Sequence, residues 1–269
     1  MNQRIIWIAW IAVFGMMAAG VSHNHPVSAG QPAVIKMGRG NATITYLSGT
    51  ATLISIDGQI IKSLSQGQTL SRGDRIRTGK NSRIEVKLPD NSFIRFDEDT
   101  SFELETVDLD QTDQRRDIRV RVILGKAWAK VSRLFSNRGR FALSTKTAVA
   151  GVRGTTYRMN VNADDSAEVK VYRGEVVVQS RAQADETTAA FQQLKESKPV
   201  SGPRPVGGPR PIPGPRRVSV TEWMHILKNM QQINIHPDGT TSKPFRFSIQ
   251  ADENEWVRWN KVRDEKVKE

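Results

Sequence analysis

The chain of 269 residues contains no cysteine. This absence excludes a disulfide-stabilised scaffold, thiolate metal sites, cysteine redox motifs and a cysteine nucleophile. Histidine is scarce as well, and after the N-terminal stretch only His225 and His236 remain, without the spacing of a metal-binding pair. The sequence also has no G-x-S-x-G, no Walker A and no strand-linked G-x-G-x-x-G motif. We therefore predict a protein that is not an enzyme and has no catalytic residues, cofactor or metal site.

The chain has fewer acidic than basic residues, 28 Asp and Glu against 40 Lys and Arg, which gives a net charge of +12. Such a balance favours anionic partners, such as phosphates, acidic glycans or lipid headgroups, but selects none of them. The hydrophobic fraction of 38% is sufficient for one packed core. At roughly 100–200 residues per domain, we expect one main domain with appendages.

The N-terminal stretch has almost no charge, since Arg4 is the only charged residue before Lys36. An apolar run covers residues 5–21, and the small residues Val27-Ser28-Ala29 follow a polar break. This order is typical of a secretory signal, with cleavage after Ala29. An uncleaved anchor helix is the alternative, although 17 residues is the lower limit for a span. We predict a signal peptide over 1–29 and a periplasmic or secreted protein of a bacterial envelope, which would contact the membrane only if this segment stays uncleaved.

Residues 43–180 predict many short strands with alternating polarity. Ile84, Val86 and Leu88 alternate with charged residues, and Asp57-Gly58 predicts a two-residue hairpin between 51–56 and 59–64. No βαβ alternation and no long helical pattern occur in this region. The pattern predicts an all-β main domain, built as a rolled sheet, a sandwich or a β-solenoid-like fold.

Charge is segregated within this region. Residues 97–113 contain eight acids and no base, whereas residues 115–158 contain twelve bases and a single acid, Asp117. The two blocks predict neighbouring strands whose charges neutralise each other. A basic binding face, or a calcium site at residues 97–99 or 108–110, is an alternative interpretation.

A linker is predicted over residues 181–218. Within it, residues 198–217 hold seven of the chain's 12 prolines and no acid. This composition predicts an extended, semi-rigid segment. Its spaced Arg204, Arg210 and Arg216 are candidates for docking onto an acidic partner.

We expect residues 219–269 to form a small helical C-terminal segment. Ser219 to Glu222 has the pattern of a capping box, and Trp223, Ile226, Leu227 and Met230 follow the spacing of one helical face. A second helix is expected near Asp252, with Trp256, Trp259 and Val262 on one face. These stripes predict packing on the β domain or on each other, and the alternative is that Trp223, Trp256 and Trp259 dock onto a partner.

The most distinctive local string is TAVAGVRGT at residues 147–155. Its glycines predict a tight bend where a Cβ would clash or where φ is positive. Arg153 is expected either to bond carbonyl groups across that bend or to bind an anion. The candidate structural or binding residues of this string are Thr147, Gly151, Arg153, Gly154 and Thr155.

The string TAVAGVRGTTY, preceded by FALSTK, resembles the signature of the FecR domain family. Gly67, Gly73, Asp74 and Gly79 fit the family's stretch G-x-x-L-x-x-G-D-x-I-x-T-G. Asp90-Asn91-Ser92 lies where the family has D-G-S, Gly125-Lys126-Ala127-Trp128 resembles its L-x-G strand, and Gly174 belongs to its closing V-x-x-G-x-V. The resemblance covers roughly residues 48–180.

The resemblance implies an envelope-side β domain for sensing, signalling or protein interaction, with no catalytic residues. The cytoplasmic segment by which ferric-citrate-type regulators control a sigma factor is not matched, because only residues 1–4 precede the apolar run. The predicted partner is therefore an envelope protein, bound for interaction, sensing or scaffolding. The alternative is an anionic glycan or polymer of the cell surface. Nucleic acid is not expected, since no interleaved aromatic platform is present.

Overall fold

A computed structural model describes residues 38–39, 41–110, 115–133, 138–152, 154–184 and 223–267. The predicted signal peptide, the Pro-rich segment with Arg204, Arg210 and Arg216, and the capping box at 219–222 lie outside these residues. Within the described part of the chain, no helix has the length and hydrophobicity needed to cross a membrane.

The strands pair in two ladders. Ladder A has the order β4-β3-β6-β9-β10-β11-β12-β15-β16, and β1 also pairs with β9. Its members are β1 (Gly38–Arg39), β3 (Ala51–Ile54), β4 (Ile60–Ser63), β6 (Arg75–Thr78), β9 (Ser101–Asp110), β10 (Arg115–Lys130), β11 (Arg138–Ser144), β12 (Ala148–Val152), β15 (Val176–Ser180) and β16 (Met224–Leu227).

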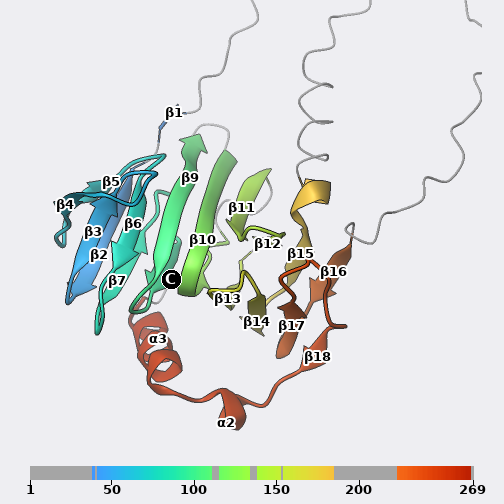
Figure 1. Cartoon of the computed structure of the whole chain (residues 1–269). Helices are drawn as coiled ribbons and strands as arrows, with labels where there is room; N and C mark the ends of the chain where they lie inside the picture. Colours follow the sequence, from blue (N-terminus) through green and yellow to red (C-terminus); the bar gives the residue numbers. More distant parts are fainter. Residues whose placement is uncertain are drawn as a thin grey trace, which may run out of the picture. The chain divides into compact units, whose positions relative to one another are not determined.

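Ladder B has the order β5-β2-β7-β8-β10-β13-β14-β17-β18. Its further members are β2 (Ala42–Ser48), β5 (Thr69–Leu70), β7 (Arg83–Lys87), β8 (Phe93–Phe96), β13 (Thr156–Val161), β14 (Ala167–Arg173), β17 (Gln231–Ile235) and β18 (Phe245–Arg246). Figure 1 shows the long strands β9 and β10 between β2–β7 on one side and β11–β18 on the other.

The two ladders share β10, which changes ladder at Gly125. Residues up to Leu124 pair with β9 in ladder A, and residues from Gly125 onward pair with β13 in ladder B. Gly125 has a φ of +96°, and a Cβ there would lie 2.7 Å from the Cα of Thr100. Glycine is thus required at this position, where the chain bends and a neighbouring backbone comes close. One continuous sheet is thereby folded into two layers, and it is mixed because β10 and β11 run parallel.

The layers enclose one hydrophobic core drawn from both ladders. Phe96 of ladder B stacks on Phe102 of ladder A, with ring centroids 3.5 Å apart. The predicted inward residues Ile84, Val86 and Leu88 are all buried, as period-two alternation requires. The expectation of an all-β fold from rolled or stacked sheets is confirmed, and the Asp57-Gly58 hairpin joins β3 to β4 as expected.

The acidic and basic blocks lie on adjacent strands, as predicted. In the antiparallel register of β9 and β10, Asp110 is opposite Arg115 and Glu103 is opposite Arg121. Lys126 also forms an ion pair with Asp97, with 3.0 Å between Nζ and Oδ2.

The C-terminal region differs from the helical segment that the sequence predicts. Residues 224–227 form β16, which extends ladder A, and not the predicted helix. The supposed helical stripe of Ile226 and Leu227 is instead an alternation, since Ile226 is exposed and Leu227 is buried in the core. With β17 and β18 paired beside β14, this region completes the β fold.

Two helices end the described chain, α2 (Ile249–Asp252) and α3 (Glu255–Lys266). Asn254 caps α3, because its side-chain oxygen accepts a hydrogen bond from the Val257 amide at 3.0 Å. The buried residues of α3 are Trp256, Val257 and Asn260. A helix near Asp252 is therefore confirmed, but the predicted inward Val262 is exposed.

Helix α3 covers the outer face of ladder B. Trp256 is almost fully buried and packs with Trp128 of β10, while Trp259 stacks on Trp256. Asp252 of α2 extends the contact with ladder B, since it forms ion pairs with Arg158 of β13 and Lys170 of β14. Trp256 and Trp259 thus pack within the chain, in agreement with the packing interpretation of this stripe, and their docking onto a partner stays a prediction.

Trp223 is held inside the chain too. It packs against the core, and its indole Nε1 donates a hydrogen bond to the Gly239 carbonyl at 2.7 Å. Its predicted role in partner docking is therefore not supported by its surroundings.

Candidate binding groove

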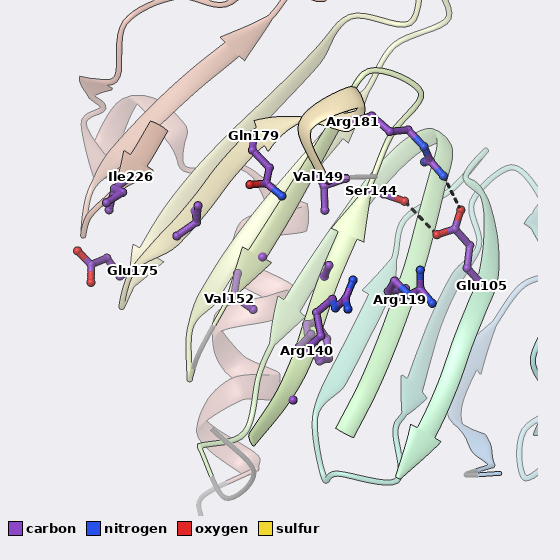
Figure 2. Close-up of a pocket in the computed structure, with 16 residues that line it drawn as sticks. Glu105, Arg119, Arg140, Ser144, Val149, Val152, Glu175, Gln179, Arg181 and Ile226 are labelled. Carbon is purple, nitrogen blue, oxygen red and sulfur yellow. Dashed lines mark hydrogen bonds and ion pairs between the residues drawn. The ribbon is translucent and has the colours of Figure 1, made fainter. Parts of the chain in front are cut away.

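A groove of about 520 Å³ lies on the outer face of ladder A. We call it the signature groove, because β12 carries part of the string that resembles the family signature. Figure 2 shows its side chains, with Glu105, Arg119 and Arg181 at one end and Glu175 and Ile226 at the other. The strands that line it are β9, β10, β11, β12, β15 and β16.

The strand register explains the shape of the floor. Arg119, Ala142, Gly151, Val177 and Ile226 are successive pairing partners across five neighbouring strands, so they form one row on one face of the sheet. Gly151 stands in the middle of this row and has no side chain. The groove is hollow at Gly151 because the side chains of its pairing partners, Ala142 and Val177, project from the sheet on both sides of the glycine.

Gly151 does not have the role predicted for it. A Cβ at this position would meet only the Val177 carbonyl oxygen, at 3.9 Å, and its φ is not in the left-handed region. Neither a clash nor a strained turn explains the glycine. What its small size changes is the depth of the groove.

The next row of the floor contains Ser144, Val149 and Gln179, which also pair in sequence across β11, β12 and β15. Val149, Val177 and Ile226 make the floor apolar, and the Ile226 side chain is 56% exposed. These outward residues were not predicted from the sequence. The available signal was the unbroken apolar runs of β12 and β15, where a solvent-facing strand would alternate with polar residues.

Charged groups border this floor. Arg181 Nη2 lies 3.3 Å from Glu105 Oε1, and Arg181 also donates to the Thr145 carbonyl at 3.0 Å. Arg119 lies 3.3 Å from Asp117. Ser144 is the only hydroxyl among the described lining residues, and no histidine accompanies it. An apolar floor with ion pairs at its border suits the binding of a polypeptide segment better than acid–base chemistry.

The rest of the signature string has a structural placement. Gly154 has a φ of +60°, and a Cβ there would lie 2.3 Å from Cγ of Arg133. Thr155 is buried and its hydroxyl donates to the Glu175 carbonyl at 3.0 Å. Thr147 lies just before β12, where its carbonyl accepts the Arg181 amide at 2.9 Å. Arg153 lies outside the described residues.

The predicted turn glycines lie in turns or at close approaches. Gly67, Gly73 and Gly174 have φ values of +85°, +88° and +92°. The Asp74 carboxylate accepts the Ser71 amide at 2.8 Å and closes the turn that contains Gly73. At Gly79 a Cβ would lie 2.3 Å from Thr50 Oγ1, so closeness and not φ calls for glycine there.

Residues 90–92 form a turn, and the structure shows contacts of this turn that the sequence did not predict. Asn91 takes a φ of +63°, which asparagine tolerates where the resembling family has glycine. Asp90 is fully buried; it accepts the Ser92 amide at 3.0 Å and pairs with Arg116 of β10. This turn is thereby tied to the sheet by a buried ion pair.

The histidines and acidic clusters form no metal centre in the described part of the chain, where no three His, Asp or Glu side chains converge. The calcium interpretation of residues 97–99 is corrected by the contacts of Asp97, whose carboxylate is used by Arg83 and Lys126. His225 Nε2 lies 3.0 Å from Thr241 Oγ1, and burial lowers its pKa.

Three comparisons with known proteins complete the description. No match was found among curated proteins. Two crystal structures of a candidate anti-sigma factor from Parabacteroides distasonis ATCC 8503, at 1.65 and 2.50 Å resolution, align with 17% identity. Their TM-scores are 0.42 and 0.41, and each alignment covers 65% of this chain. The aligned part spans 61% of the length of those structures.

The family comparison concerns a region that contains most of the residues that line the groove. Residues 74–177 match the model described as "FecR protein". This range begins at Asp74 of the first glycine-rich stretch and ends at Val177 on the groove floor. The resemblance predicted from the sequence is confirmed for residues 74–177, which match this family model.

Proposed function

We propose that the chain is an exported, non-enzymatic FecR-like module of the bacterial envelope that binds a protein partner in the signature groove. The observation that carries the proposal is the row of floor residues, in which Gly151 leaves a hollow between Ala142 and Val177. An exposed apolar floor of this kind is a common feature of interaction sites. Most of this row, from Arg119 to Val177, lies within the residues that match the FecR family model, which supports the same assignment.

The occupant that fits is an extended segment of the partner. The groove ends at β16, which pairs with β15 on one side and, among the described residues, has no strand on its other side. An extended segment placed there gains main-chain hydrogen bonds from β16 and covers Met224 and Ile226, which are 54% and 56% exposed. This mode uses the backbone for affinity and the apolar floor for selectivity.

Site-specific photo-crosslinking in cells that produce the full chain tests this function. The crosslinker is placed at Ile226 or at Gln179 in the groove, and a control is placed at the exposed Lys62 of β4. We expect one envelope protein to be captured from both groove positions and not from Lys62. Gly151→Val, which fills the hollow, should remove this product. Equal capture from Lys62, or capture that is insensitive to Gly151→Val, contradicts the proposal.

Export is tested separately. N-terminal sequencing of the protein from the envelope fraction should give Gly30 as the first residue. A chain that retains Met1 and stays with the membranes indicates the anchor alternative, and a chain that retains Met1 in the soluble cell interior contradicts export.

A further inference from the structure

A second hollow, of about 710 Å³, is lined by cations. Arg133, Arg173, Lys228 and Arg246 line it together with Glu175, Asn229 and two glycines. All four cationic side chains are exposed, and within the described part of the chain none of them has an ion-pair partner. Several arginines elsewhere on the ladders are paired, for example Arg95 with Glu85 and Arg158 with Asp252. The hollow therefore gathers positive charge that the fold leaves uncompensated.

The cations come from four separate segments, and hydrogen bonds of the main chain join three of these segments. Gly174 donates its amide to the Asn229 side chain at 2.6 Å, which joins the turn after β14 to the turn after β16. The Met230 amide donates to the Val171 carbonyl at 2.8 Å, and the Met230 carbonyl accepts the Phe247 amide at 3.1 Å. Lys228, Arg173 and Arg246 are thus carried by backbone segments bonded to one another.

Arg133 is placed by a glycine of the signature string. Its Cγ lies where a Cβ of residue 154 would be, at 2.3 Å, so the arginine stem lies over Gly154. Any larger residue at 154 would displace it. Gly154 consequently has a second effect besides forming the turn, because it leaves room for the fourth cation, Arg133, to reach the hollow.

The composition of the lining indicates the chemistry of the ligand. Among the described residues that line the hollow, none has an apolar or aromatic side chain, so they offer neither an anchor for lipid acyl chains nor a surface for stacking nucleobases. Three of the four cations are arginines, whose planar guanidinium groups bind phosphate oxygens in pairs. The volume exceeds what one phosphate needs. We propose that this hollow binds a linear phosphate-bearing polyanion.

Isothermal titration calorimetry of the full chain with inorganic tripolyphosphate tests the proposal, at roughly 50 and 200 mM salt. The triple variant Arg173→Gln, Lys228→Gln, Arg246→Gln should lose at least about 100-fold in affinity, since charge-assisted hydrogen bonds each contribute about tenfold. Its affinity should also depend less steeply on salt, because fewer counterions are released. The matched control is Lys62→Gln, Arg72→Gln, Lys80→Gln, which removes the same charge from exposed positions elsewhere and should change affinity less than about threefold.

Glu175→Gln provides a test in the opposite direction. Glu175 is the single carboxylate among the described residues that line the hollow, so its neutralisation should tighten tripolyphosphate binding by about threefold or more. A gain of affinity cannot be produced by misfolding. Glu265→Gln, an exposed carboxylate on α3, is the control and should leave the affinity nearly unchanged.

The results that overturn the proposal are defined by the same experiments. Equal losses in the two triple variants would show that only net charge matters. Absence of tripolyphosphate binding at millimolar concentration also refutes the proposal, and so does binding confined to vesicles of anionic phospholipid in phosphatidylcholine. The described lining residues of the two sites have only Glu175 in common, and the crosslinks at Ile226 and Gln179 report on the signature groove alone, so they decide the proposed function independently.

Discussion

Arg95 of β8 donates a hydrogen bond to Asp264 of α3, with 2.5 Å between Nη1 and Oδ1. The Arg95 side chain is fully buried, and its Nε donates to Glu85 at 2.6 Å. Arg263 of the same helix completes the cluster, because it reaches Glu85 at 2.9 Å. Helix α3 therefore supplies both a negative and a positive group to charges on the outer face of ladder B.

This relationship predicts that Asp264→Asn destabilises the fold by about 2–3 kcal/mol. Removing one partner of a buried pair leaves the other charge poorly compensated, and Asp264 also accepts the Trp128 indole at 3.0 Å. Urea denaturation followed by tryptophan fluorescence measures the change. The control is Asp165→Asn, which removes an exposed pair with Lys146 and should cost less than about 1 kcal/mol. Similar losses in both variants would contradict a special role for the buried pair.

The same cluster predicts how stability depends on pH. Burial alone would raise the pKa of Glu85, but hydrogen bonds from Arg263, Arg95 and Thr45 lower it from 4.5 to about 2. A carboxylate whose pKa is lower in the folded state stabilises that state above the unfolded pKa. This contribution is lost as pH falls from about 4.5 toward about 2.

We therefore expect the urea midpoint of the wild type to fall across that window, and that of Glu85→Gln to fall less steeply. Asp252 remains in the variant with a lowered pKa, since its hydrogen bonds with Lys170 and Tyr172 and the charge of Arg158 outweigh the effect of burial. Some pH dependence should therefore persist. Parallel curves for the two proteins between pH 4.5 and 2 would show that Glu85 does not contribute.

Local patterns predicted the strands but not what covers them. Residues 83–87 alternate as expected, and the sequence places Glu85 on the polar face, where solvent would be assumed. The structure covers that face with α3, whose residues lie some 170 positions further along the chain. Such a contact depends on tertiary packing and has no local signature.

The C-terminal error has a related cause. Trp223, Ile226, Leu227 and Met230 satisfy a helical period, yet Met224 to Leu227 pairs with β15. The buried side chain of Leu227 fills the core between the ladders, and this burial outweighs a weak helical preference. A truncation at residue 198, which the linker composition would suggest as harmless, removes Leu227, Ile233 and Ile235 from the core.

The glycines that resemble those of the family lie in turns or at close approaches, as predicted. The physical reason why glycine is needed differs from one position to the next. Gly125 combines a positive φ with a close approach to Thr100, while Gly67 has a positive φ and no heavy atom within 4 Å of its missing Cβ. Sequence alone cannot separate these cases, because both appear as glycine in a turn-rich strand region.

That difference yields a further prediction. Gly67→Ala should cost about 1 kcal/mol, which is the strain of placing an L residue at positive φ. Gly125→Ala should cost about 3 kcal/mol or more, since its Cβ also overlaps the Thr100 backbone and the point where β10 changes ladder. Thermal denaturation by circular dichroism compares the two variants. Equal costs would contradict the close packing described at Gly125.

The two glycines of the signature string should respond in opposite ways. Gly151→Ala places its methyl group in ordinary contact with the Val177 carbonyl at 3.9 Å and requires no unusual φ. Its free energy of unfolding should stay the same or rise by up to about 1 kcal/mol, because alanine has less freedom in the unfolded chain. Gly154→Ala adds strain at a φ of +60° and displaces Arg133, so we expect a loss of about 1–2 kcal/mol.

The order of the two variants should be reversed for partner binding: the more stable Gly151→Ala variant should bind less well than Gly154→Ala. Gly151→Ala makes the hollow of the signature groove shallower while the fold is kept, so crosslinking from Ile226 should decrease although the variant is at least as stable as the wild type. Gly154→Ala leaves the groove floor unchanged and should retain that crosslink under conditions where it is folded. If the stable Gly151→Ala variant binds as well as the wild type, the groove is not the contact surface, and the glycine at 151 would need another explanation.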